Sequence, residues 1–220
     1  MTRIFGHDPA ALAGRLRTPL LADALDALGL RRQAIGPGIV PLAPADVLIG
    51  VAFTVNGVLA EQVPEVPYVG LLASLEAIGP GEVYVVSSGG SPAAALFGEL
   101  MATACSARRA AGALCDGYVR DAARVRALGF PCFARGTLPL DSNGRFEITG
   151  HGEPVTVDGV EISCGDLIVA DEDGVVVAPA GVAAEALARA LEKDVDEGRF
   201  RDAIRAGMPP FEAFERFRVL

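Results

Sequence analysis

The segment from Asp116 to Asp121 places a cation and two carboxylates directly after a short apolar run, 113–115, that predicts a strand. The planar guanidinium of Arg120 suits a substrate carboxylate, and Asp121 offers an oxygen ligand for a hard cation. Ligands of open α/β sheets bind beyond the carboxyl ends of parallel strands, where this segment is expected. The alternative is that Arg120 and Asp121 only begin a helix, with Asp121 complementing its dipole.

A second candidate is the small-residue loop 87–92, Ser-Ser-Gly-Gly-Ser-Pro, between a predicted strand and a predicted helix. Glycine-rich turns of this kind present backbone N–H groups and a helix dipole to an anion. The loop lacks the Gly-Lys-Ser/Thr of a Walker loop and is not G-x-G-x-x-G. A carboxylate- or phosphate-binding loop and a plain tight turn both stay open.

The lysine content restricts the chemistry. Lys193 is the only lysine of the chain, and it stands among four carboxylates, Glu192, Asp194, Asp196 and Glu197. A Schiff-base lysine needs a desolvated pocket that lowers its pKa, whereas these neighbours favour the charged form. The sequence therefore comes close to excluding a mechanism through a lysine imine.

Metal and disulfide motifs built on cysteine or histidine are also missing. The four cysteines, Cys105, Cys115, Cys132 and Cys164, show no C-x-x-C spacing, and the two histidines are far apart in the sequence. The sequence therefore predicts structural thiols in a reducing compartment and disfavours a zinc site.

Composition excludes several classes of protein. Hydrophobic residues make up 51% of the 220 residues and charged residues 21%, which is typical of a folded globular chain. The net charge of −9 disfavours a nucleic-acid partner. No apolar run reaches the roughly 20 residues of a membrane span, and the N-terminus does not resemble a signal peptide. We expect a cytoplasmic protein with no membrane partner.

Helices and strands alternate in the first two thirds of the chain. Thr18 is expected to cap a helix that ends at Gly29, with Pro19 in its first turn. The remaining elements are expected at 47–55 (strand), 67–78 (helix), 82–86 (strand), 94–110 (helix), 113–115 (strand), 121–128 (helix) and 132–134 (strand). Such alternation predicts a parallel βαβ sheet.

The pattern changes from Arg145 to short strands separated by turn signals such as Asp158-Gly159. These strands are expected at 146–149, 154–157, 160–162, 166–170 and 175–178. A long helix at about 180–206 and a short one after Pro209-Pro210 follow. We predict one α/β domain over residues 1–220 with a mixed sheet, N-terminal helices at about 8–29 and C-terminal oligomerisation helices at about 180–217.

Four motifs together resemble the RraA-like family from about residue 18 to the C-terminus. They are Gly98-Glu99-Leu100-Met101, Asp116-Gly117-x-x-Arg120-Asp121, Phe133-Ala134-Arg135-Gly136 and Gly165-Asp166-x-x-x-Ala170-Asp171-x-Asp173-Gly174-Val175-Val176. That family includes 4-hydroxy-4-methyl-2-oxoglutarate/4-carboxy-4-hydroxy-2-oxoadipate aldolases and the RraA inhibitors of RNase E. The resemblance implies a three-layer ββα swivelling-domain fold and a homotrimer or hexamer with active sites at subunit interfaces.

The resemblance also implies roles for particular residues. Asp121 would bind Mg²⁺, or Mn²⁺ or another divalent cation, while Arg120 and the backbone amides of Leu100 and Met101 would hold the pyruvyl carboxylate. Glu99 stands where the family's aldolases usually carry Asp, and would hold a metal-bound water or act as an acid/base.

A further carboxylate is implied to come from a neighbouring subunit. Glu197 matches the position of that residue, and Asp194 and Asp196 are alternatives in the same polar run. Catalytic roles are therefore expected for Arg120, Glu99 and Glu197.

The implied activity is a class II aldolase or decarboxylase. Cleaving the bond beside a 2-oxo acid leaves an enolate, which a divalent cation and Arg120 could stabilise without a lysine imine. Substrates would be a 4-hydroxy-2-oxo acid of the 4-hydroxy-4-methyl-2-oxoglutarate type, or oxaloacetate, with pyruvate as the product. The alternatives are an RraA-type regulator that binds a ribonuclease, and a lyase for a different oxo or hydroxy acid.

Three other features favour structural interpretations. The segment 141–145 is expected to be a polar turn in preference to a substrate-side loop. Asp171 and Asp173 are expected to serve a turn in preference to a second metal site. Phe211, Phe214 and Phe217 have helical spacing and predict a packing stripe, either within the chain or against another subunit.

Overall fold

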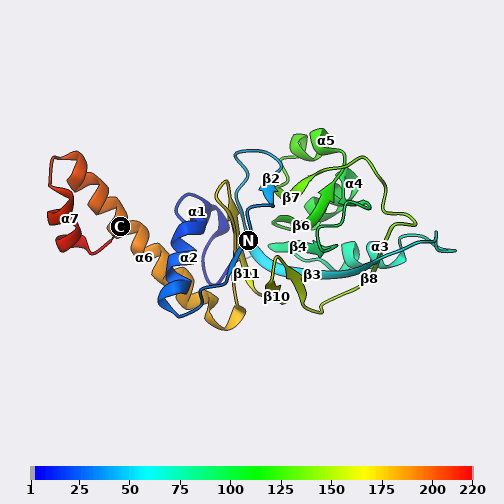
Figure 1. Cartoon of the computed structure of the whole chain (residues 1–220), viewed down its shortest axis with the longest axis horizontal. Coiled ribbons are helices and arrows are strands. Elements are labelled where there is room, and N and C mark those ends of the chain that lie inside the picture. Colours follow the sequence, from blue (N-terminus) through cyan, green and yellow to red (C-terminus); the bar gives the residue numbers. More distant parts are fainter. Residues whose placement is uncertain (1–2, 220) are drawn as a thin grey trace.

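A mixed sheet of ten strands runs through residues 3–219, the part of the chain that the computed structural model describes (Figure 1). The order along the sheet is β1-β12-β11-β3-β4-β6-β7-β2, with β5 beside β6 and β8 beside β3. These strands are β1 Ala34–Ile35, β2 Val40–Pro41, β3 Leu48–Leu59, β4 Glu82–Ser87, β5 Ala95–Phe97, β6 Gly112–Val119, β7 Cys132–Thr137, β8 Phe146–His151, β11 Leu167–Asp171 and β12 Gly174–Ala178.

The parallel βαβ unit predicted for the middle of the chain is confirmed. β3, β4, β6 and β7 pair in parallel. The connections between them contain three helices: α3 Val69–Ala77, α4 Glu99–Ala107 and α5 Ala122–Ala127. Apolar residues of these helices and strands, among them Leu75, Ala102, Val125 and Cys115, form one buried cluster. This packing fixes the carboxyl ends of β6 and β7 beside the amino end of α4.

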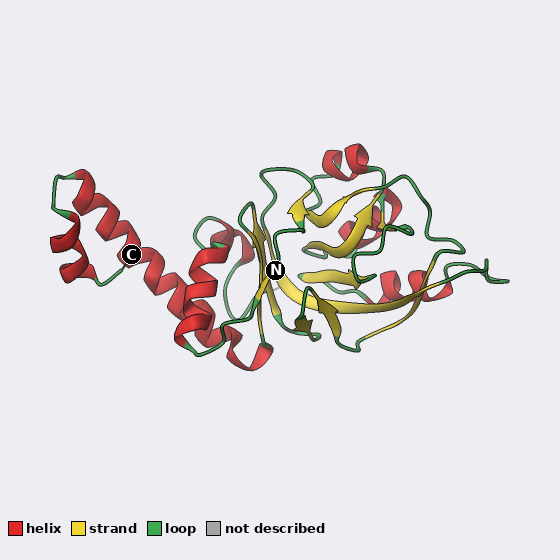
Figure 2. Cartoon of the chain, in the orientation of Figure 1, coloured by secondary structure: helices red, strands yellow, loops and turns green. Residues whose placement is uncertain are grey.

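A second layer of helices covers the antiparallel end of the sheet. α1 Pro9–Ala13, α2 Thr18–Ala27 and α6 Ala180–Arg205 pack through leucine and alanine side chains on β11 and β12. Figure 2 shows the strands between this group of helices and the group α3 to α5. The separate hairpin of β9 Val155–Val157 and β10 Val160–Ile162 closes a third apolar cluster against the strands. The mixed α/β fold with a mixed sheet is therefore as predicted.

The secondary structure differs from the prediction in two places, at the start of the helix expected from residue 94 and at the end of the strand expected to stop at residue 115. The expected helix at 94–110 is instead the short strand β5 followed by α4, which begins only at Glu99. The expected loop 116–119 is the second half of β6. The two differences have one cause, because β5 adds a strand beside Tyr118 and Val119 and supplies hydrogen-bond partners to the backbone there.

Thr18 does not cap α2 as predicted, because it is the first residue of the helix and Arg17 occupies the cap position. Asp171 at the end of β11 accepts hydrogen bonds from the Thr18 N–H at 2.8 Å and from its hydroxyl at 2.6 Å. Asp171 also accepts from the N–H of Asp173 at 3.0 Å. The carboxylate thus caps a distant helix and holds its own turn, in agreement with the structural interpretation of this turn.

The C-terminal helices extend away from the sheet (Figure 1). The buried residues of α6, Ala183, Ala186, Leu187 and Ala190, all lie in its first half, and α7 Pro210–Phe217 folds back beside the second half. Phe211 is 75% exposed and Phe214 is 39% exposed, so neither is buried within one chain; packing on another subunit stays a prediction. Among residues 3–219, no helix has the length and apolar character needed to cross a membrane.

Candidate active site

Arg120 and Asp121 lie at the turn between β6 and α5, as their position after a parallel strand predicts. The N–H of Arg120 donates to the carbonyl of Phe97 at 2.9 Å, which ties this turn to the end of β5. Asp121 occupies the N-cap of α5 with φ 56° and ψ 32°, in the left-handed region that asparagine and aspartate tolerate better than most residues. Its side chain is 48% exposed and lies 3.7 Å from Nε of Arg120.

The N-terminus of α4 faces the same turn. Gly98 is the N-cap, and a Cβ at this position would lie 3.0 Å from Cγ of Arg120 and 3.3 Å from Oδ2 of Asp121. A helix leaves its first N–H groups without intrahelical acceptors, so those of Leu100 and Met101 are available to an anion. Glu99 also lies in this first turn and accepts a hydrogen bond from Thr103 at 3.1 Å.

These residues line one pocket of about 420 Å³, large enough for a small organic acid. The pocket therefore brings together Glu99, Leu100, Met101, Arg120 and Asp121, which the sequence placed in two separate segments. Arg120 supplies a cation, α4 supplies N–H groups, and the carboxylates supply oxygen ligands or proton carriers. This arrangement can bind a carboxylate and carry acid–base chemistry next to it.

Sequence reasoning missed Tyr68 as a residue of this pocket and ranked a substrate-side position for Asp141 below a polar turn. Asp141 accepts a hydrogen bond from the hydroxyl of Tyr68 at 2.7 Å and forms an ion pair with Nη1 of Arg120 at 3.2 Å. The segment 141–145 is a turn as expected, yet Asp141 and Ser142 also line the pocket. The composition of this segment is compatible with both a polar turn and a substrate-side loop, and only the fold shows that it is both.

The contacts between Tyr68, Asp141 and Arg120 shift the pKa of two of these groups. Burial by itself would raise the pKa of Asp141, but the hydrogen bond from Tyr68 and the charge of Arg120 outweigh it and lower the pKa. The hydrogen bond to Asp141 raises the pKa of Tyr68, and burial adds to this increase. The pair is thus held as a carboxylate and a neutral phenol at neutral pH.

The loop 87–92 is a tight turn, so it is not an open anion-binding loop. The N–H groups of Ser88 and Gly90 donate to the carbonyl of Asp116 at 3.1 and 3.3 Å. The hydroxyl of Ser87 donates to the Asp116 carboxylate at 2.8 Å, and Nε of Arg135 donates to its other oxygen at 2.6 Å. Asp116 is only 2% exposed, so its carboxylate is buried and satisfied by hydrogen bonds within this cluster.

Glu197 is not near Arg120 within one chain. It lies on α6, where it pairs with Arg17 at 3.2 Å and lies 3.9 Å from Lys193, and it lines a different pocket. Lys193 is also on α6 and forms an ion pair with Asp23. Lys193 does not line the Arg120 pocket of its own chain.

The contacts of the pocket carboxylates indicate which of them could bind a metal ion. Among residues 3–219, no group of three or more His, Cys, Asp or Glu side chains is close enough to hold a metal ion as a set. Mg²⁺ is often bound by one or two carboxylates and keeps several waters, so a single half-exposed carboxylate at a pocket fits it. Asp121 meets this description, whereas the oxygens of Asp141 are already used by Tyr68 and Arg120.

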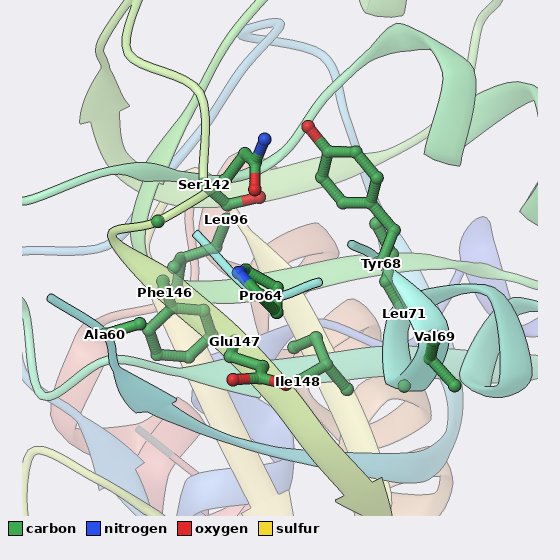
Figure 3. A pocket seen from close by; sticks show the side chains of 13 residues that line it. Ala60, Pro64, Tyr68, Val69, Leu71, Leu96, Ser142, Phe146, Glu147 and Ile148 are labelled. Atoms are coloured by element: carbon green, nitrogen blue, oxygen red, sulfur yellow. The ribbon is translucent and has the colours of Figure 1, made fainter. Parts of the chain in front are cut away.

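A second, smaller cavity lies on the other side of Tyr68 and Leu71. Figure 3 shows Tyr68, Val69 and Leu71 on one side of it and Ala60 and Phe146 on the other. Its volume of about 30 Å³ corresponds to a single water molecule, so it cannot hold an oxo acid. The larger pocket is therefore the candidate substrate site.

Comparison with known proteins agrees with this fold. A family model described as "RraA-like: Aldolase/RraA" matches residues 18–177. The chain belongs to the RraA-like family. A protein of Halalkalibacterium halodurans named "Putative 4-hydroxy-4-methyl-2-oxoglutarate aldolase" is 32% identical over 197 residues, which cover 90% of this chain and 89% of that protein.

Solved structures of related sequence have the same fold. A crystal structure of an uncharacterized protein from Pseudomonas syringae pv. tomato has a TM-score of 0.82 at 30% identity and covers 94% of this chain and 92% of that one. Streptomyces coelicolor RraAS2, described as an unusual member of the RNase ES inhibitor RraA family, has a TM-score of 0.77 at 32% identity, with 87% and 95% covered. Relatives of this chain thus carry both aldolase and ribonuclease-inhibitor names.

Proposed function

We propose that this RraA-like chain is a divalent-metal-dependent lyase that releases pyruvate. Its substrate would be a 4-hydroxy-2-oxo acid, as in 4-hydroxy-4-methyl-2-oxoglutarate, or oxaloacetate. The observation that carries the proposal is the meeting of Arg120, Asp121, Glu99 and the α4 N-terminus in one pocket. A protein that only binds a partner has no need of a cation, a free helix N-terminus and carboxylates around a pocket of substrate size.

The chain's own residues would bind and orient the pyruvyl end. Arg120 donates to the substrate carboxylate through the side of its guanidinium that Asp141 leaves free, and the N–H groups of Leu100 and Met101 donate from the other side. Glu99, in the same first turn of α4, takes the proton of the C4 hydroxyl through a water molecule.

The reaction balances without an oxidant or a second substrate. In the aldol cleavage the C3–C4 bond breaks, its electron pair stays on C3, the C4 hydroxyl loses its proton, and C3 gains one to give pyruvate. The C4 fragment leaves as an aldehyde or ketone. Asp121 would hold the divalent cation, Mg²⁺, Mn²⁺ or a similar ion, which supplies Lewis-acid stabilisation of the negative charge on the keto oxygen.

The expected assembly is part of the proposal. Glu197 does not reach the Arg120 pocket of its own chain, so a catalytic role for it requires a second copy, as in a homotrimer or hexamer. The exposed phenylalanines of α7 and the extension of α6 away from the sheet support such contacts. Light scattering of the purified chain and Glu197→Gln kinetics test this part.

The test of the proposed function is pyruvate release from 4-hydroxy-4-methyl-2-oxoglutarate and from oxaloacetate, with Mg²⁺ and with EDTA. Turnover that requires the metal and falls at least about 100-fold in Asp121→Ala supports the lyase. Glu161→Ala is the matched control, because Glu161 is an exposed carboxylate on β10 that does not line the pocket. Turnover that EDTA and Asp121→Ala leave unchanged contradicts the metal-dependent mechanism.

A ribonuclease regulator is the second candidate, favoured by the likeness to RraAS2. The net charge of −9 suits docking on the basic segments of an RNA-binding enzyme. Inhibition of an RNase E-type enzyme that survives Asp121→Ala, without pyruvate release by the wild-type chain, would move the assignment to this candidate.

A further inference from the structure

Arg17 is the closest basic contact of Glu197, the carboxylate that the proposed function brings to the pocket of a neighbouring copy. Its Nη2 lies 3.2 Å from Oε2 of Glu197 and 3.6 Å from Oδ1 of Asp194. Lys193 and Arg201 lie farther from the Glu197 carboxylate, at 3.9 and 4.0 Å. Of these three cations, Arg17 therefore accompanies Glu197 most closely.

Arg17 and Glu197 are fixed to each other by the packing of two helices. Arg17 is the N-cap residue of α2, and Glu197 lies on α6. The two helices pack side by side through a buried apolar cluster that includes Leu21, Leu187 and Ala190 (Figure 1). A copy that brings Glu197 to another copy's pocket must therefore bring Arg17 as well.

The Arg120 pocket needs another cation if Glu197 enters it. Of the lining residues, all within the described part of the chain, Arg120 is the one cation, against three carboxylates. Arg120 already contacts one of them, Asp141, at 3.2 Å. A divalent cation at Asp121 would offset part of the negative charge, but Glu197 would add a fourth carboxylate, and like charges in one site repel each other. A cation that arrives with Glu197 offsets this repulsion.

The guanidinium of Arg17 keeps hydrogen-bond donors for a ligand. Within residues 3–219, the polar contacts of its side chain are those with Asp194 and Glu197, and both are made by Nη2. The side chain is 50% exposed. A guanidinium has five N–H donors and can bind a carboxylate through two parallel hydrogen bonds. Nε and Nη1 of Arg17 can therefore bind a further carboxylate while Nη2 holds Glu197.

We propose that Arg17 of a neighbouring copy enters the Arg120 pocket together with Glu197 and binds the second carboxylate of a dicarboxylic substrate. The inference rests on the proposed function for the pyruvyl end at Arg120 and for the approach of a neighbouring α6. The two ends of one substrate then meet two different arginines. Discrimination between dicarboxylic and monocarboxylic acids depends on a residue that does not line the pocket of its own chain.

The test compares two unreactive acids by titration calorimetry with the full chain in its assembled state and Mg²⁺. In 5-methyl-2-oxohexanoate an isopropyl end replaces the distal carboxylate of 2-oxoglutarate, and neither acid has a C4 hydroxyl that could be cleaved. We expect the wild type to bind 2-oxoglutarate at least about tenfold more tightly, and Arg17→Met to lose this preference. A wild type without the preference, or an Arg17→Met variant that keeps it, overturns the inference.

Arg15→Met is the matched control, because Arg15 also pairs with α6 and its side chain is 47% exposed. Its Nε donates to Asp194 at 3.1 Å and its Nη2 donates to the carbonyl of Leu191 at 3.0 Å. Arg15 makes no ion pair with Glu197, so the variant should keep the wild-type ratio of the two affinities. A loss of preference in Arg15→Met as large as in Arg17→Met would contradict a specific role for Arg17.

Glu197→Gln separates a direct contact of Arg17 from an indirect effect. If Arg17 itself binds the distal carboxylate, Glu197→Gln keeps the preference for 2-oxoglutarate, because the cation is still present. If Arg17 only holds Glu197 in place, Glu197→Gln loses the preference as Arg17→Met does, and the proposed contact is wrong. Arg17→Lys keeps the charge but not the planar fork, so it should retain part of the preference.

Mixed oligomers test whether Arg17 acts across the subunit boundary. When Arg17→Met and Asp121→Ala chains are co-expressed, some pockets combine an intact Asp121 with Arg17 of the other chain. These pockets should bind 2-oxoglutarate with wild-type affinity, which neither variant does alone. A mixture without such tight sites, or a wild type that light scattering shows to be a monomer, overturns the inference.

The binding result does not depend on turnover. If the lyase proposal fails, the wild type releases no pyruvate, while the effect of Arg17→Met on the ratio of the two affinities is still measurable. If the inference on Arg17 fails, pyruvate release continues while Arg17→Met binds both acids as the wild type does. The two failures are therefore distinguishable.

Discussion

Asp141 and Arg120 form an ion pair of 3.2 Å between the turn after β7 and the turn after β6. Tyr68, just before α3, donates to the other oxygen of the same carboxylate at 2.7 Å. Three separate segments thus meet at one guanidinium, and its orientation is set by Asp141. The side of Arg120 that Asp141 does not occupy is the side that can receive a substrate carboxylate.

Replacing Arg120 with lysine should separate charge from geometry. Arg120→Lys keeps the positive charge but loses the planar fork that can bind Asp141 and a substrate carboxylate together. Loss of one charge-assisted hydrogen bond, about 1.5–3 kcal/mol, predicts a fall of about 10- to 100-fold in kcat/KM for pyruvate release.

The matched control for this change is Arg124→Lys, an exposed arginine on α5 that does not line the pocket. It should keep wild-type kinetics. Equal kinetics for Arg120→Lys and Arg124→Lys would contradict a role for the guanidinium fork.

Tyr68→Phe should raise the pKa of Asp141 toward its ordinary value of 3.8, because the hydrogen bond that lowers it is lost. A lowered folded-state pKa stabilises the protein above the unfolded-state pKa, and this contribution is lost as the pH falls through the folded value. The variant should therefore lose stability relative to wild type at neutral pH and show little difference in strong acid.

Carbon-13 NMR titration of the aspartate carboxyls measures this shift, with Asp141→Asn identifying the resonance. Tyr118→Phe is the control, since Tyr118 lies on β6 and makes no hydrogen bond to Asp141. The same Asp141 midpoint in wild type and Tyr68→Phe would rule out the proposed coupling.

Much of the fold follows from local pattern. Apolar runs bounded by glycine and proline predict β3, β4, β7 and the C-terminal strands, since turns interrupt the backbone where these residues occur. The position of Arg120 and Asp121 at a strand's carboxyl end follows from the parallel βαβ rule. The pairing of this segment with Glu99 came from the family resemblance and not from spacing alone.

Other features depend on contacts between distant segments. The length of β6 is set by pairing with β5 and β7, which no property of residues 116–119 themselves reveals. The first N–H group of α2, that of Thr18, is capped by the side chain of Asp171, which is 153 residues away in the sequence. Tyr68 and Asp141 are likewise ordinary loop residues until the fold brings them to Arg120.

Gly98→Ala should reduce activity with little loss of stability. The backbone at Gly98 is extended, with φ −161°, so alanine can adopt it, but its Cβ would lie 3.0 Å from Cγ of Arg120. Displacing the guanidinium by a few tenths of an ångström should lower kcat/KM by about tenfold.

Gly181→Ala is the control for this glycine, because a Cβ there meets nothing within 4 Å and the residue lies in α6. It should retain wild-type activity. Wild-type kcat/KM in Gly98→Ala would show that Arg120 does not need its present position.

Arg135→Met should destabilise the fold, because it leaves the buried Asp116 carboxylate without its cation. Arg135 contacts Asp116 and Asp158 at 2.6 Å each, and Asp116 is 2% exposed. Removing one partner of a buried pair costs about 3 kcal/mol or more, which predicts a fall in Tm of about 6–12 °C for a chain of this size.

The control is Arg189→Met, because the side chains of Arg189 and Glu185 form a 2.6 Å pair on the surface, where they are 45% and 57% exposed. Such surface pairs contribute about 0–1 kcal/mol. Thermal unfolding followed by circular dichroism compares the two variants, and equal Tm values would mean that the Asp116 carboxylate tolerates burial without Arg135.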